Sequence, residues 1–161
     1  MRKSTFVGNL VAWLVVGAVC AAFLAWYHVS DLDVVSAAIG SSALVQLGVV
    51  LGGPVLMYAI GVVLGLLLLW FKKISLGRGF KLLWRVLGLV GLAVIALAAV
   101  PLLGGDAATA FMWASVIVVY VSVVAPVLIM VLGFLYALGC AGTDRAKRGP
   151  FAKYLPDDHF E

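Results

Sequence analysis

Side chains able to bind a metal or exchange a proton gather in two short polar segments. Positions 157–159 read Asp-Asp-His, and His28 lies a few residues before Asp31 and Asp33. Carboxylates beside an imidazole are ligands for divalent cations and partners in acid–base catalysis. Neither segment has the residue spacing of a zinc site or a nucleotide-binding loop. Neither places a nucleophile where a catalytic base could reach it. We therefore expect no enzyme, no metal and no cofactor, and an enzyme built on His28, Asp31 and Asp33 is the weakest hypothesis.

The sequence between these segments is too apolar for a water-soluble domain. Of its 161 residues, 65% are hydrophobic and 11% are charged, and the mean hydropathy is +1.21. A soluble domain is nearer to about half apolar and about a quarter charged. No polar sequence is available to coat a large core, so a lipid bilayer is the expected solvent. The net charge of +4 then indicates contact with anionic lipid and not with nucleic acid.

Turns and basic clusters divide the chain into four predicted transmembrane helices, at about 6–27, 48–71, 82–103 and 107–138. The apolar stretch 34–71 is too long for one perpendicular crossing of a core about 30 Å thick at about 1.5 Å per residue. Two interpretations of its first part stay open: an interfacial helix over 34–47, or one long tilted and kinked helix. The predicted fold is thus an all-α, four-helix membrane domain over 1–138, followed by a cytoplasmic tail over 139–161.

The basic residues form clusters at 2–3, 72–85 and 145–153. The turns at 28–33 and 104–106 carry aspartates instead. Because lysine and arginine are retained on the cytoplasmic side of a membrane, both termini are predicted to be cytoplasmic. This orientation puts His28 and His159 on opposite sides of the bilayer, so the two cannot share a metal ion. A bacterial inner (cytoplasmic) membrane is the expected location.

Small residues recur at four-residue spacing along the second and fourth predicted spans. The pairs are Gly48 with Gly52, Gly61 with Gly65, and Gly133 with Ala137. Such spacing puts small residues on one face of a helix, where they allow two backbones to approach closely. This face is predicted to pack either within the chain or against a partner subunit.

Charged side chains are absent from the middle of every predicted span. Intramembrane charges usually mark ion paths or proton relays, so this sequence disfavours a proton-coupled pump and a haem ligated by intramembrane histidine. Pro54 and Pro126 interrupt the second and fourth spans, and each is expected to kink its helix. Without a nearby charge, we interpret the kinks as shaping the bundle, with a hinge as the alternative.

The predicted inner loop alternates cations with large apolar side chains. The residues expected at the lipid surface are Lys72, Lys73, Arg78, Phe80, Lys81, Trp84 and Arg85. In this arrangement Phe80 and Trp84 would enter the headgroup layer while the cations meet anionic lipid of the inner leaflet, at about 1 kcal/mol per cation.

The two halves of the chain match in part at an offset of 72 positions. Pro54-Val55-Leu56 corresponds to Pro126-Val127-Leu128, Gly61 to Gly133 and Gly65 to Ala137. One interpretation is a parallel duplication of a helical hairpin, and the other is chance recurrence in a sequence rich in Val, Leu and Gly. A duplicated chain would contain two similar hairpins, each beginning in the cytoplasm.

The hypothesis that fits these patterns best is a non-catalytic small membrane subunit or adaptor of a larger membrane complex. Its expected partners are the bilayer and either another membrane protein or further copies of itself. The alternative is a small transporter or an oligomeric, holin-like channel, because a pore can form from backbone carbonyls and hydroxyl groups without any charge.

Overall fold

The structure is a computed structural model that describes residues 3–72, 75–103 and 106–143. Its main elements are α1 (Lys3–Val29), α2 (Leu32–Ser41), α3 (Ala43–Lys72), α4 (Arg78–Leu97), the 3-10 helix η1 (Val100–Leu103), α5 (Asp106–Val124) and α6 (Pro126–Gly139). Two strands of two residues each, β1 (Ser75–Leu76) and β2 (Gly142–Thr143), form a short parallel pair. The described fold is therefore all-helical apart from this pair, as the all-α part of the predicted fold class requires.

In the part of the chain that the structure describes, three helical segments are long and apolar enough to cross a membrane: Phe6–Val29, Ala43–Lys72 and Gly79–Leu102. A fourth crossing is obtained only if α5 and α6 are taken together as one broken span, because the chain bends by 99° between them. These lengths and compositions are compatible with a membrane protein.

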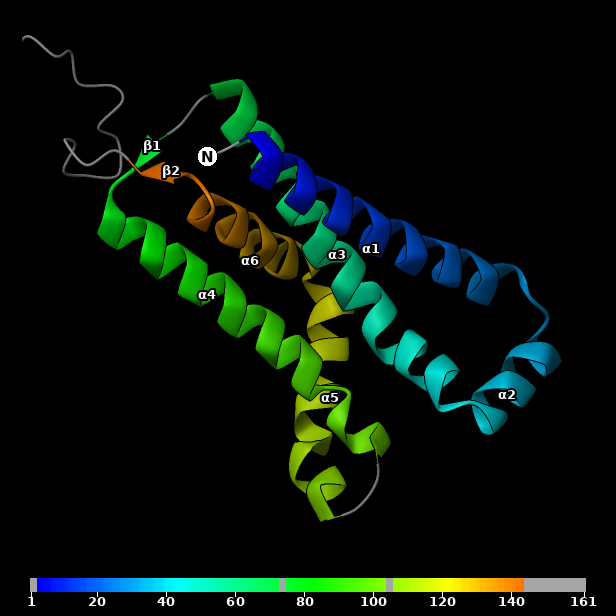
Figure 1. The fold of residues 1–161 in the computed structure, drawn as a ribbon. Coiled ribbons are helices and arrows are strands. Elements are labelled where there is room, and N and C mark those ends of the chain that lie inside the picture. The colour runs from blue at the N-terminus through cyan, green and yellow to red at the C-terminus, as the bar shows by residue number, and fades with distance from the viewer. Residues whose placement is uncertain (1–2, 73–74, 104–105, 144–161) are drawn as a thin grey trace, which may run out of the picture.

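The long helices pack in the spatial order α1, α3, α6, α4 (Figure 1). Fully buried Tyr58, Val62 and Leu66 all belong to α3, which lies between α1 and α6. The core around them is completed from the other helices by residues such as Ile95, Val118, Ile129 and Ala137. α3 is thus the central helix of the bundle.

A break at Ser42 separates α2 from α3. Ser42 has an extended backbone (φ −135°, ψ 116°), and the side-chain amide of Gln46 donates a 2.8 Å hydrogen bond to the Ile39 carbonyl across the break. Serine hydroxyls compete with helical hydrogen bonds, and Ser41-Ser42 supplies two of them. The stretch 34–71 is therefore neither one long helix nor a lead-in that extends to residue 47.

The predicted helix over 107–138 is likewise divided in the structure. α5 ends at Val124, Ala125 takes φ −139° and ψ 58°, and Pro126 is the first residue of α6. Proline has no N–H and disfavours helical backbone at the residue before it, which explains a break at this position. α5 consequently leaves the bundle and projects to one side of it (Figure 1).

The basic loop and the start of the tail meet at one end of the bundle. Ser75 pairs with Gly142 and Leu76 with Thr143, and a small second core of Leu69, Leu76 and Ala141 lies beside this pair. The beginning of α1 lies at the same end (Figure 1). We call this the basic end, because it holds Lys72 at the end of α3 and Lys81 and Arg85 near the start of α4.

Candidate functional site

The closest approach in the bundle is a crossing of α3 and α6 at two glycines. A Cβ atom added to Gly61 would collide with the carbonyl oxygen of Met130, and one added to Gly133 would collide with that of Tyr58. One turn further along, a Cβ on Gly65 would lie 2.6 Å from the Cβ of Ala137. Glycine is required here because only its missing side chain lets the two backbones touch.

The contacts at this crossing are reciprocal. Gly61 and Gly133 differ by 72 positions, and the carbonyls that they meet, those of Met130 and Tyr58, differ by the same 72. Such reciprocal contacts are expected when two parallel helices are related by an approximate two-fold axis. Each helix then uses the same surface to contact the other. Two of the pairs matched in the sequence, Gly61 with Gly133 and Gly65 with Ala137, thus lie together at this crossing.

Gly48 and Gly52 face a different neighbour from Gly61 and Gly65. A Cβ on Gly48 would overlap the ring of Phe23, and one on Gly52 would lie 3.5 Å from Leu24, both on α1. The four glycines therefore do not form one face of α3. The N-terminal pair serves the α1 contact, and the C-terminal pair serves the α6 contact.

The small residues that join α4 to α6 were not predicted. A Cβ on Gly88 would lie 2.5 Å from the Cβ of Tyr136, one on Gly91 would lie 2.9 Å from the Leu132 side chain, and one on Gly139 would lie 2.6 Å from the backbone of Arg85. The signal available in the sequence was the helical spacing of Gly88 and Gly91. Glycine residues therefore allow close packing of α6 against both of its neighbours, α3 and α4.

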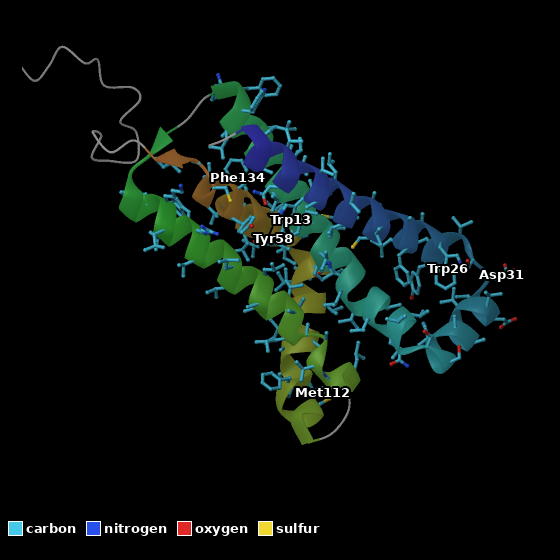
Figure 2. The ribbon with its side chains drawn as sticks, viewed as in Figure 1. Trp13, Trp26, Asp31, Tyr58, Met112 and Phe134 are labelled. Atoms are coloured by element: carbon cyan, nitrogen blue, oxygen red, sulfur yellow. The ribbon has the colours of Figure 1, made fainter. Side chains whose placement is uncertain are left out.

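An aromatic cluster fills the space where α1, α3, α4 and α6 converge. The ring of Trp13 lies 5.3 Å from that of Tyr58 and 6.0 Å from that of Tyr136, and the two tyrosine rings are 6.3 Å apart. Trp13 and Tyr58 lie together at the centre of the bundle in Figure 2. The buried Tyr58 hydroxyl donates a 2.8 Å hydrogen bond to the carbonyl of Gly88.

This hydrogen bond was not predicted, although a buried tyrosine hydroxyl usually needs a partner. Gly88 thus takes part in two contacts: its carbonyl accepts this bond, and its missing side chain leaves room for Tyr136. The crossing and the aromatic cluster together hold four helices in register, and we take them as the candidate functional site. Its groups are aromatic rings, tyrosine hydroxyls and backbone carbonyls, a set suited to packing and to hydrogen bonding.

In the described part of the chain, no three His, Cys, Asp or Glu side chains come together in a way that would hold a metal ion. Positions 157–159 lie outside the described residues. Exposed His28 and Asp31 lie at the end of α1 far from the aromatic cluster, as Asp31 shows in Figure 2. Within the described residues, every buried side-chain nitrogen and oxygen has a hydrogen-bond partner.

The residues predicted to meet the lipid surface have different environments at the basic end. Lys72 and Phe80 are exposed, whereas Trp84 is half-buried and packs against the small second core. Lys73 and the side chain of Arg78 lie outside the described residues. The indole of Trp84 thus has a contact within the protein that the sequence did not indicate.

Two further cations lie beside the C-terminal end of α6. The backbone of Arg85 contacts Gly139, and Arg85 and Lys81 both act electrostatically on Cys140, the residue after α6. Burial raises the pKa of the Cys140 thiol, and the two cations act in the opposite direction. Cations at a helix C-terminus offset the partial negative charge of its free carbonyls. Lys81 and Arg85 are therefore placed to stabilise α6 in addition to any contact with lipid.

Replacing Trp84 with alanine is expected to destabilise the basic end, because it removes a half-buried indole from the second core. We expect a loss of about 2 kcal/mol of unfolding free energy, less than the ~3–5 kcal/mol for a fully buried tryptophan. Phe80→Ala is the matched control, since the Phe80 ring is 40% exposed. Thermal unfolding in detergent, followed by circular dichroism, measures both. Equal effects of the two substitutions would contradict a packing role for Trp84.

An open apolar groove of about 370 Å³ runs between α1 and α3. Small residues line its floor, among them Gly17, Ala21 and Ala59, and Trp13 of the aromatic cluster closes one part of it. The groove thus borders the candidate site from the outside and presents almost only apolar surface to its surroundings.

No family model, no curated protein and no solved structure matches this chain.

Proposed function

We propose that this protein is a non-catalytic integral membrane subunit or adaptor that works within a larger membrane complex. Its spans cross a bacterial inner membrane with both termini and the basic end in the cytoplasm, where the basic end contacts anionic lipid. The two hairpins, α1–α3 and α4–α6, arose by duplication and pair through the crossing of α3 and α6.

The observation that carries this proposal is the closed centre of the bundle. At Gly61 and Gly133 the backbones of α3 and α6 are in contact, and the fully buried side chains of Tyr58, Val62 and Leu66 fill the surrounding space. A carrier or a single-chain channel needs room or polar lining along its axis. A bundle packed in this way supports a structural role, with function exercised through its outer surface.

α5 supplies an outer surface suited to a protein partner. It is a 19-residue helix that projects from the bundle (Figure 1), and its Trp113 and Tyr120 side chains are 69% and 64% exposed. Aromatic residues are enriched at the centres of protein interfaces. A second membrane protein that packs along α5 would bury these rings.

Purification of the tagged protein from its native membrane in a mild detergent tests the proposal. We expect a stoichiometric membrane-protein partner, and about tenfold less of that partner with Trp113→Ala plus Tyr120→Ala, as for the loss of a binding hot spot. Val15→Ala plus Val19→Ala, two exposed positions on α1, is the control and should leave recovery unchanged.

Purified protein reconstituted alone in liposomes gives the opposing outcome. Selective flux of a solute or ion through those vesicles, together with a homo-oligomer and no partner in the native-membrane purification, would overturn the subunit proposal. That result would favour a pore formed between copies of the chain.

A further inference from the structure

We propose that the Ala125–Pro126 joint is a hinge, about which α5 moves between the bent position and a position in line with α6. This inference goes beyond the proposed function; its length argument rests on the membrane setting proposed there, but not on the subunit role. In the in-line position, α5 and α6 would form one continuous helix like α3.

The first argument is that equivalent prolines occur in two different backbone states. Pro54 lies inside the continuous helix α3, whereas the chain bends by 99° just before Pro126. Both prolines begin the same Pro-Val-Leu sequence, and both precede the crossing glycine of their helix by seven positions. A Pro-Val-Leu sequence at equivalent places thus occurs both inside a continuous helix and directly after a sharp bend.

The residues before each proline explain which state is preferred. Gly52 and Gly53 precede Pro54. Val124 and Ala125 precede Pro126. The proline ring clashes with the Cβ and N–H of the residue before it when that residue is helical. Glycine relieves part of this clash in α3, whereas at the second joint Ala125 avoids it by leaving the helical conformation.

The second argument is a polar contact that holds α5 in the bent position. The Ser115 hydroxyl donates a 2.6 Å hydrogen bond to the carbonyl of Ala98, the residue after α4. Other residues of α5 are exposed and apolar, among them Met112 and Val123, and Met112 lies far from the aromatic cluster in Figure 2. Movement of α5 in line with α6 would break this bond.

The third argument is length. α6 has 14 residues and spans only about 21 Å at 1.5 Å per residue, less than the ~30 Å of a hydrocarbon core. α3, its counterpart, has 30 residues and spans about 45 Å. Only the in-line position gives α6 a length comparable to that of its counterpart. The bent position leaves α5 directed across the bundle axis.

Distance measurement between spin labels tests the hinge in the whole protein in lipid bilayers. Cys20→Ala and Cys140→Ser first remove the native thiols, and labels are then attached at Met112→Cys and Val131→Cys, both exposed positions. The in-line position predicts a separation of about 28 Å between these sites, and the bent position about 20 Å. We expect the native sequence to show both distances.

Three substitutions assign the two distances to the hinge. Pro126→Ala restores the missing N–H and should shift the population to the longer distance, while Pro54→Ala is the matched control and should not. Ser115→Ala removes the contact to Ala98 and should raise the ratio of long to short distances about threefold, the factor for an average hydrogen bond between membrane helices. A label pair at Leu44 and Leu64, both exposed on α3, should report a constant distance of about 30 Å throughout.

The distances in the native sequence are the primary test, and either of the two variants, Pro126→Ala or Ser115→Ala, is enough to assign them to the hinge if the other fails to fold. The hinge is supported if the native sequence shows two distances and one further condition is met. Either the longer distance equals the one measured in Pro126→Ala, or the fraction of molecules with the longer distance rises in Ser115→Ala. The short distance alone in the native sequence overturns it, as does a long-distance fraction that is unchanged in both variants.

Discussion

Alanine at Gly61 is expected to cost about 3 kcal/mol of unfolding free energy, the upper part of the range for overpacked cores. The added Cβ would collide with the carbonyl oxygen of Met130, which is fixed in α6 and cannot move aside as a flexible side chain would. The two helices must therefore separate, and the close packing of Val62 and Leu66 between them is lost. Gly133→Ala should have an effect of similar size, because its contact with the carbonyl of Tyr58 is equivalent.

The matched control for this pair is Gly8→Ala, in α1. A Cβ at Gly8 meets no atom within 4 Å, and alanine is favoured over glycine in a helix by roughly 0.5–1 kcal/mol. We expect this variant to be as stable as the native protein or slightly more so. Thermal unfolding and size-exclusion profiles in one detergent compare the three. Native-like melting of Gly61→Ala and Gly133→Ala would show that α3 and α6 do not touch at these positions.

Replacing Tyr58 with alanine is the second change with a large expected effect, about 3–5 kcal/mol. The side chain is completely buried, its ring packs against Trp13 and Tyr136, and its hydroxyl donates a hydrogen bond to the Gly88 carbonyl. Truncation removes all three contributions and leaves a cavity where four helices converge.

Tyr58→Phe separates the hydroxyl from the ring. It retains the aromatic packing and removes only the hydrogen bond, at an expected cost of about 1 kcal/mol. Tyr120→Ala, in which the lost ring is 64% exposed, is the control and should change stability by less than about 0.5 kcal/mol. Unfolding midpoints followed by tryptophan fluorescence measure the series. The order Ala, Phe, native in rising stability is expected, and equal midpoints for Tyr58→Phe and Tyr58→Ala would contradict a packing role for the ring.

The helical class and most of the long helices could be predicted because apolar length and the position of turns determine them. The 72-position offset pairs Gly61 with Gly133 from the sequence alone. That these two glycines meet depends on the packing of α3 against α6, which local sequence does not encode. The acceptor of the Tyr58 hydroxyl is a backbone carbonyl, a group that every residue has, so no residue type could have marked Gly88 for this role.

The two breaks illustrate a different limit. Ser42 and Ala125 both interrupt stretches whose composition is mostly apolar, so hydropathy could not separate the elements on either side. Pro126 was predicted to kink its helix, and the structure has a bend of 99° just before it; proline alone did not distinguish between these two outcomes. The difference from Pro54 comes from the residues before each proline, glycine in one case and valine and alanine in the other.

The reciprocal crossing also has a consequence for biosynthesis. α3 leaves the ribosome well before α6 is made, so for that interval its glycine face has no partner within its own chain. The face that it presents fits an equivalent glycine face, and the α3 of a neighbouring nascent chain offers one. We therefore expect the later helix of the same chain and the α3 of a neighbouring chain to compete for this face while the protein is made, so that slow elongation through 73–125 would increase pairing between chains.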